Sequence, residues 1–118
     1  MSEELCFLSL ADMSAAVKRG DASPRELCDA HLERIEALDP ELRAFVTVTA
    51  DHARRDAARA ERDMGKGEAR GPLHGIPIGL KDIYDTAGIT TTGHSRTMAD
   101  RVPQRDAGCW ERLRQAGA

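Results

Sequence analysis

Gly71-Pro72-Leu73-His74-Gly75-Ile76-Pro77-Ile78-Gly79-Leu80-Lys81-Asp82 is the stretch of this 118-residue chain that most restricts its fold. A short apolar run, residues 76–80, ends in a lysine and carries glycines and prolines, the residues that most often interrupt regular structure. The run predicts a short buried strand with special backbone at both ends. Because an ammonium group is rarely buried without a partner, Lys81 at the end of that strand requires a reason.

Two explanations of Lys81 follow from chemistry. An apolar site disfavours the charged form of a lysine, and the neutral amine is a competent general base in Ser–Lys acyl transfer. Alternatively, Lys81 lies at the end of the strand and points to water, or pairs with Asp82 or Asp85. Composition and spacing alone favour the second explanation.

The composition is that of a soluble globular domain, with 41% hydrophobic and 31% charged residues. A net charge of −3, from 17 basic and 20 acidic residues, argues against nucleic acid or an anionic membrane as the main partner. Glu3 and Glu4 stand where a signal peptide would be basic, and no run approaches the roughly 20 apolar residues of a membrane span. Three widely spaced cysteines suit a reducing compartment. These features predict a cytoplasmic protein.

Local signals predict an α/β order of elements that begins with helices. Ser9 with Asp12, and Ser23 with Glu26, form capping pairs that are typical of helix starts. Pro40 is expected to end the second helix, because proline cannot donate the next backbone hydrogen bond. The predicted helices are residues 9–20, 23–40, 51–64 and 106–117, and the predicted strands are residues 44–49 and 76–80.

The C-terminal third is predicted to be a long loop followed by a helix. Residues 82–103 carry glycines and a run of threonines, which favour turns. Asp106 is the expected N-cap of the last helix and Gly117 its expected C-cap. Trp110 on that helix is expected to be a core anchor.

Other kinds of site are not indicated. A phosphate-binding loop requires Gly-Lys-Ser/Thr, whereas Leu80 separates Gly79 from Lys81 and no hydroxyl follows. The histidines and cysteines lack the spacing of metal ligands, so no metal and no cofactor is expected. Ser95 and the threonines at 90–92 are hydroxyl nucleophile candidates, but hydroxyls in a glycine-containing loop more often form turns.

Three blocks of the sequence resemble the N-terminal part of the amidase signature family. The blocks are residues 71–82 as quoted above, Ala87-Gly88-Ile89 with Thr91, Thr92 and Ser95, and Asp106-Ala107 with Arg112-Leu113-Arg114-Gln115-Ala116-Gly117-Ala118. Together with the helical opening, they extend the resemblance over the whole chain. Thr90 stands where the family usually has proline, and His94 where many members have glycine. Both departures lie in the loop after the lysine and leave the first block intact.

The resemblance implies both a fold and a mechanism. The family has a large α/β/α domain around a mixed sheet, and its members cleave carboxamides with a Ser–cisSer–Lys triad. The lysine of the first block is the family's base, which makes Lys81 the implied catalytic residue here. In the family it acts through a bridging serine on a second serine, which attacks the amide carbonyl and forms an acyl-enzyme. Backbone N–H groups near the nucleophile then stabilise the oxyanion.

The Gly- and Ser-rich block that holds both serines and the oxyanion hole in the family has no counterpart in this sequence. The resemblance therefore implies that residues 1–118 are the N-terminal segment of a single amidase domain, and that this segment alone is almost inactive. The implied partners are a small-molecule amide and either the remainder of the enzyme or a second copy. Two alternatives stay open: a segment of the A-type subunit of a glutamyl/aspartyl-tRNA amidotransferase, and a non-catalytic module descended from an amidase.

Overall fold

The computed structural model describes residues 2–118 and divides them into two compact units. The first unit comprises the chain up to Pro77 together with residues 116–118, and the second comprises residues 78–115. Each unit is described by itself. The helices are α1 (Ser2–Leu5), α2 (Leu10–Arg19), α3 (Pro24–Leu42) and α4 (Ala50–Gly65) in the first unit, and the 3-10 helix η1 (Arg96–Met98) and α5 (Gly108–Gln115) in the second.

The predicted N-caps of the first two long helices are confirmed. The Ser9 hydroxyl accepts the N–H of Asp12 at 3.1 Å at the start of α2, and Gly20 ends this helix in the left-handed conformation. At α3, Ser23 and Glu26 form a complete capping box, with distances of 3.1 Å and 2.8 Å between the side-chain oxygens and the backbone nitrogens. Side-chain caps of this kind satisfy backbone donors that a helix leaves open, so they fix where each helix begins.

The predicted end of α3 at Pro40 is wrong, because the helix continues to Leu42. Arg43, in the left-handed conformation, donates its N–H to the Asp39 carbonyl at 2.7 Å. The Asp39 carboxylate in turn accepts the N–H groups of Ala44 and Phe45 at 2.7 and 3.1 Å. A proline in the last turn removes one hydrogen bond, and these contacts complete the turn around it.

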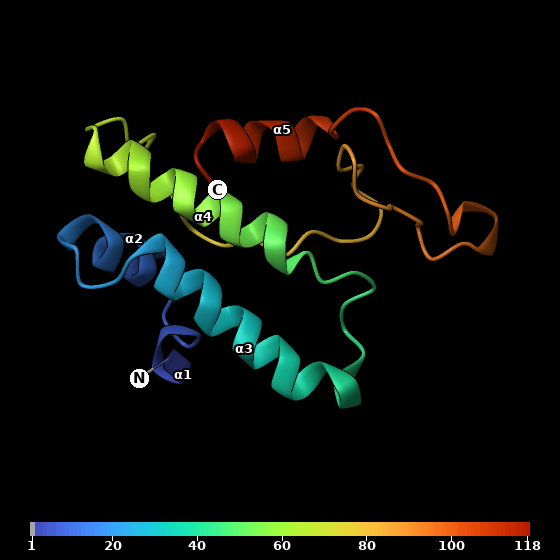
Figure 1. The fold of residues 1–118 in the computed structure, drawn as a ribbon, viewed down its shortest axis with the longest axis horizontal. Coiled ribbons are helices and arrows are strands. Elements are labelled where there is room, and N and C mark those ends of the chain that lie inside the picture. The colour runs from blue at the N-terminus through green and yellow to red at the C-terminus, as the bar shows by residue number, and fades with distance from the viewer. Residues whose placement is uncertain (1) are drawn as a thin grey trace. The chain divides into compact units, whose positions relative to one another are not determined.

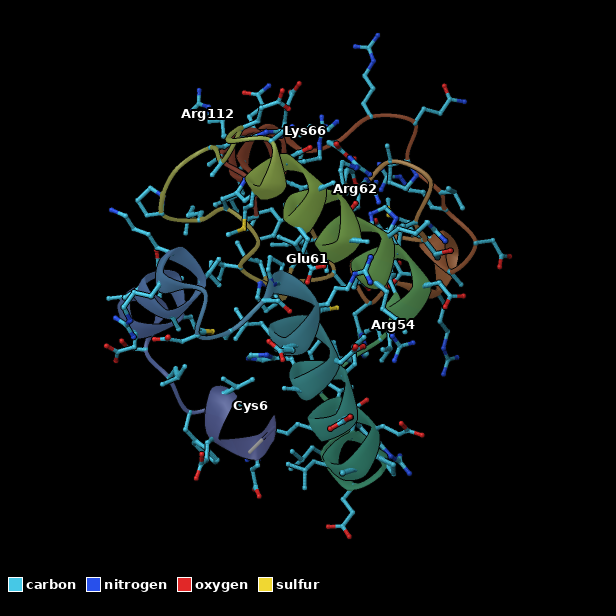
Figure 2. All side chains as sticks on the ribbon, turned by 60° about the vertical axis from the view of Figure 1, so that its left-hand side comes forward. Cys6, Arg54, Glu61, Arg62, Lys66 and Arg112 are labelled. Atoms are coloured by element: carbon cyan, nitrogen blue, oxygen red, sulfur yellow. The ribbon has the colours of Figure 1, made fainter. Side chains whose placement is uncertain are left out.

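Helices α3 and α4 lie side by side and antiparallel in the first unit (Figure 1). Two ion pairs join them, from Arg25 to Glu61 at 3.1 Å and from Arg54 to Asp29 at 2.9 Å, and Figure 2 shows Arg54 and Glu61 on the same helix. Both helices bury small residues, Cys28 and Ala30 on α3 and Ala57 and Ala60 on α4, and α3 also buries the larger Pro24 and Leu27. Small side chains allow two helices to approach closely. The exposed ion pairs add little stability, although they favour this pairing over others.

The core of the first unit is formed by Leu27 and Ile76, which are 0% and 2% exposed. Ala16, Val17 and Ala22 complete the cluster. Ile76 comes from the segment before Lys81, so the apolar run identified in the sequence is anchored in this core at its first residue. Full burial of one such aliphatic side chain contributes about 2 kcal/mol to the free energy of unfolding.

Buried His74 ties the segment before Ile76 to α4. Its Nε2 lies 2.9 Å from the Ala60 carbonyl, and its Nδ1 accepts the N–H of Arg70 at 3.2 Å. A carbonyl can only accept a hydrogen bond, so the hydrogen resides on Nε2. The N–H of Gly75 donates to the Gly117 carbonyl at 2.8 Å, which brings residues 116–118 into the first unit.

The two predicted strands are wrong, and the expected mixed sheet is not found in residues 2–118. Residues 43–49 and 76–81 are irregular, and an isolated antiparallel bridge from Thr86 to Ile89 is the β-pairing that the described chain contains. β-branched residues fit a pleated surface, but a strand exists only when a neighbouring strand completes its hydrogen bonds. Phe45 and Val46 are accordingly 41% and 57% exposed.

Helix α4 is confirmed to within a residue at each end, whereas the predicted start of the last helix is wrong. Helix α5 begins at Gly108, and the Ala107 carbonyl accepts the N–H of Glu111 at 2.9 Å. Trp110 is buried. Gly117, the expected C-cap, lies two residues beyond Gln115 with φ +99°. None of the helices between residues 2 and 118 is long and apolar enough to cross a bilayer.

Gly75 supplies a test of this packing. It has φ +77°, and a Cβ built on it would lie 2.6 Å from Cγ of Pro24, the buried first residue of α3. Gly75→Ala should lower the free energy of unfolding by about 2 kcal/mol or more, from backbone strain together with overlap. Urea denaturation measures this change.

Gly65→Ala is the matched control, because Gly65 ends α4 without a positive φ and has open space around its Cα. This variant should be neutral or stabilising by less than about 1 kcal/mol. Equal urea midpoints for Gly75→Ala and Gly65→Ala would contradict the close approach of residue 75 to α3.

Candidate active site

Lys81 lies in the second unit, in the irregular segment that follows Ile76, and its side chain is exposed. Its carbonyl accepts the N–H of Tyr84 at 3.0 Å, which closes a turn directly after the lysine. Within residues 2–118 the Lys81 ammonium makes no hydrogen bond and no ion pair. The described residues thus leave this amine open to water, as one of the two explanations from the sequence expected.

The alternative partners of Lys81 are engaged elsewhere. The Asp82 carboxylate accepts the N–H of Thr92 at 2.9 Å and also the Thr92 hydroxyl. The Asp82 carbonyl accepts the N–H of Gly93 at 2.7 Å, and Thr92 Oγ1 accepts the N–H of His94 at 3.0 Å. We call this set of contacts among Asp82, Thr92, Gly93 and His94 the Asp82 clasp. It closes the loop that starts immediately after Lys81.

Asp85 holds the same unit together at a second point. Arg101 donates to both carboxylate oxygens of Asp85, each at 2.7 Å, in the bidentate geometry that suits guanidinium and carboxylate. The Asp85 carbonyl accepts the N–H of Ala107 at 2.7 Å, and the Arg101 carbonyl accepts the N–H of Thr91 at 3.0 Å. This pair therefore joins the two sides of the loop rather than binding Lys81.

Asp106 is the third carboxylate of this kind. It was expected to cap the last helix, but its Oδ1 accepts the N–H of Ala87 at 2.8 Å and its Oδ2 pairs with Arg114 at 3.3 Å. The sequence reasoning therefore misassigned Asp106 and missed the organising roles of Asp82 and Asp85. The sequence feature that could have indicated these roles is the position of all three aspartates in loops, where aspartate side chains commonly accept backbone N–H groups.

These contacts shift the acid–base properties of two aspartates. The hydrogen bond from the Thr92 side chain, followed by that from its N–H, lowers the pKa of Asp82 below the usual 3.8. The hydrogen bonds from Arg101 likewise lower the pKa of Asp85 below 3.8. Both carboxylates are therefore fully charged at neutral pH, where they accept hydrogen bonds best.

The hydroxyl candidates of the loop act as turn residues. Ser95 Oγ lies 2.9 Å from Thr97 Oγ1, and the buried Thr91 donates its hydroxyl to the Ile89 carbonyl at 3.1 Å. No group of three or more His, Cys, Asp or Glu side chains in residues 2–118 is arranged to hold a metal ion.

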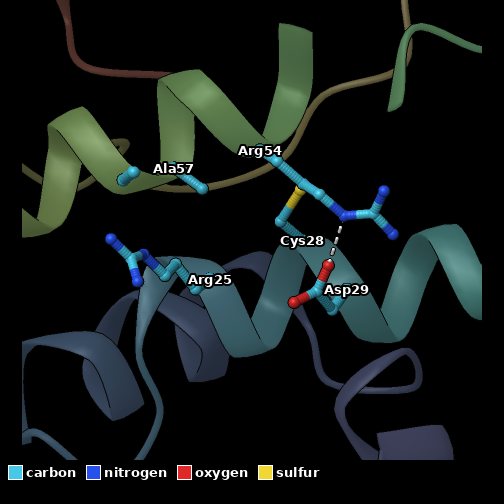
Figure 3. A pocket seen from close by; sticks show the side chains of 6 residues that line it. Arg25, Cys28, Asp29, Arg54 and Ala57 are labelled. Atoms are coloured by element: carbon cyan, nitrogen blue, oxygen red, sulfur yellow. Dashed lines mark hydrogen bonds and ion pairs between the residues drawn. The ribbon is translucent and has the colours of Figure 1, made fainter. Parts of the chain in front are cut away.

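A hollow of about 270 Å³ lies in the first unit, between α3 and α4 (Figure 3). Cys28 lines it, beside the ion pair of Arg54 and Asp29. Burial, and after it the charge of Asp29, raises the pKa of the Cys28 thiol above its ordinary value. A thiol in this state is a poor nucleophile, so the hollow is not the candidate active site.

Comparison with known proteins identifies the family. The sequence model of the family described as Amidase matches residues 26–118. The chain is 46% identical over 101 residues, 86% of its length, to the A subunit of the glutamyl-tRNA(Gln) amidotransferase of Synechococcus sp. strain CC9605. It is 43% identical over 99% of its length to the protein of the same name from Anaeromyxobacter sp. strain K.

A solved structure agrees in fold with this chain. The native peptide amidase from Stenotrophomonas maltophilia superposes with a TM-score of 0.89 and 39% sequence identity over 95% of this chain. The chain spans less than a quarter of these relatives, with 21% and 24% of the two amidotransferase proteins and 23% of the peptide amidase. The match therefore concerns one part of each of those larger proteins.

The Arg101–Asp85 pair has a measurable consequence for protonation. Arg101→Gln should raise the pKa of Asp85 back toward 3.8, because the hydrogen bonds to the charged carboxylate are lost. Asp85 has a lower pKa in the folded protein than in the unfolded chain. Its stabilising contribution is thus complete above about pH 3.8 and is lost as the pH falls through the folded value.

Carboxyl ¹³C shifts followed by NMR titration measure the Asp85 pKa. Arg96→Gln is the matched control, since Arg96 is exposed and contributes nothing to the pKa of Asp85. An Asp85 pKa that is the same in Arg101→Gln and Arg96→Gln would contradict the bidentate pair.

Proposed function

This chain belongs to the amidase family, and on that premise we propose that it is the N-terminal, lysine-bearing segment of an enzyme that hydrolyses carboxamide C–N bonds, with Lys81 as its base. The observation that carries the proposal is the state of Lys81. It lies inside the region matched by the family, and its amine is committed to no carboxylate of residues 2–118. An amine that is already ion-paired would hold its proton too strongly to serve as a base.

The chemistry assigned to Lys81 is a proton relay. The neutral amine accepts a proton from a bridging serine hydroxyl, which takes the proton of a second serine as that serine attacks the amide carbonyl. The C–N bond then breaks, the leaving amine or ammonia receives a proton, and water hydrolyses the acyl-enzyme. Both serines and the oxyanion hole belong to the remainder of the enzyme, so residues 1–118 alone should be inactive.

The remainder of the enzyme also supplies the surroundings of Lys81. In residues 2–118 this lysine is exposed, whereas a neutral amine at physiological pH requires removal from water. We infer that residues 1–118 are one segment of a single amidase domain and that the rest of that domain is their partner. The proposed substrate is a small-molecule amide, and the proposed compartment is the cytoplasm.

A second candidate is the A-type subunit of an amidotransferase. The Synechococcus and Anaeromyxobacter proteins are 46% and 43% identical to this chain, compared with 39% for the peptide amidase. This function uses the same C–N cleavage, but it delivers ammonia to an acceptor rather than releasing it. It would require partner subunits.

Lys81→Ala in the full-length protein tests the base assignment. The variant should lower kcat on the order of 10²–10⁴-fold, the usual contribution of a general base, and should leave the fold intact because the side chain is exposed. Release of ammonia from a carboxamide measures kcat, and circular dichroism monitors the fold. Lys18→Ala, at another exposed lysine, is the control and should retain full activity. A folded, active Lys81→Ala enzyme would refute the assignment.

The two candidate functions differ in what they require. A hydrolase should release ammonia from simple carboxamides without any other protein. An amidotransferase component should use glutamine and depend on partner proteins together with a glutamyl-tRNA acceptor. Ammonia release by the purified full-length protein, measured with and without these additions, separates them. Full activity toward simple amides without additions would rule out the amidotransferase function.

A further inference from the structure

We propose that Asp82 is a positioning residue, which fixes the place of the Lys81 amine by closing the Asp82 clasp with Thr92, Gly93 and His94. This inference rests on the proposed function of Lys81 and adds a role for a second residue. It concerns the second unit alone, in which all of these residues lie.

The Lys81 side chain does not hold itself in place. Its ammonium has no partner within residues 2–118, and its stem has four rotatable bonds. What the described chain can control is the position and direction of the Lys81 backbone. Any device that fixes this backbone therefore limits the region that the amine can reach.

Asp82, in contrast, is held at two separate points. Its carboxylate accepts two hydrogens from Thr92, and its carbonyl accepts the N–H of Gly93 at 2.7 Å. These contacts restrict both the side chain and the backbone of Asp82. Lys81 is joined to it by one planar peptide bond, so the restriction extends directly to Lys81.

The residues that Asp82 contacts in the clasp are themselves held by hydrogen bonds. Thr92 Oγ1 donates to Asp82 and accepts the N–H of His94 at 3.0 Å, so both of its hydrogen-bonding roles are used. His94 has φ +61°, a left-handed conformation that is uncommon for a residue with a side chain. The Asp82 clasp thus joins residues ten apart in the sequence, and Lys81 is the residue directly before it.

Asp85 provides the comparison within the same unit. Its bidentate pair with Arg101 also closes the loop, but it lies four residues from Lys81, and neither its carboxylate nor its carbonyl contacts a neighbour of Lys81. Loss of either aspartate should weaken the unit. Loss of Asp82 alone should displace the base, and a displacement of about 1 Å can cost on the order of 10²-fold in rate.

The test measures kcat and KM for amide hydrolysis in the full-length enzyme. Asp82→Asn keeps the shape of the side chain but weakens acceptance from Thr92, and it should lower kcat about 10- to 100-fold with KM within about twofold. Asp85→Asn should lower the melting temperature similarly while kcat stays within about twofold. Comparable losses of kcat in the two variants would mean a merely structural role and would overturn the proposal.

A second pair of variants changes Thr92, the residue that donates to the Asp82 carboxylate, so this test does not depend on the stability of Asp82→Asn. Thr92→Val removes the hydroxyl and should lower kcat, whereas Thr92→Ser restores it and should recover most of the activity. Equal kcat for Thr92→Val and Thr92→Ser would also overturn the proposal. Lys81→Ala, run in parallel, separates the two hypotheses, since an active Lys81→Ala enzyme refutes the proposed function itself. An inactive Lys81→Ala with fully active clasp variants refutes only the inference about Asp82.

Discussion

The burial of Ile76 among the helices of the first unit is the contact on which the packing of residues 74–76 against that unit depends. Ile76 is 2% exposed beside the fully buried Leu27, and it lies five residues before Lys81. Gly75, with φ +77° and close to Pro24, permits the approach that this burial requires. Apolar packing therefore anchors Ile76 within the first unit, and hydrogen bonds anchor Asp82 within the second.

The two anchors differ because the two units differ in composition. The first unit has long amphipathic helices, and its core is built from aliphatic side chains. The second unit is mostly loop, and three aspartates supply much of its cohesion by accepting backbone N–H groups and arginine hydrogens. Buried or half-buried backbone groups must be paired, and in a segment without a sheet the carboxylates of short side chains are suitable acceptors.

The helices could be predicted from the sequence because their signals are local. Ser23 and Glu26 specify the start of α3 within one turn, and Gly20 ends α2 for reasons of backbone conformation. Pro40 led to a wrong helix end because Asp39, the residue before it, supplies capping contacts that allow α3 to continue for two more residues. The expected strands failed for a different reason. β-propensity at residues 44–49 and 76–80 is a property of the segment, but a strand also requires a partner, which residues 2–118 do not provide.

The candidate site, like the fold, could be predicted from the sequence only in part. Lys81 could be selected from the sequence because an isolated cation at the end of an apolar run is conspicuous, and the family match covers that position. The contacts that organise the surroundings of Lys81 could not be predicted from the sequence. Asp82 and Thr92 are ten residues apart in a loop, and no local signal specifies the path of that loop. The position of the Lys81 amine and its exposure to water are thus determined separately. Residues 82–94 fix the backbone next to the one that carries the amine, whereas the proposed function would require residues outside 2–118 to exclude water from that amine. Exposure of Lys81 in residues 2–118 is therefore compatible with the base role that we propose for it, because a group can be placed by one part of a fold and desolvated by another.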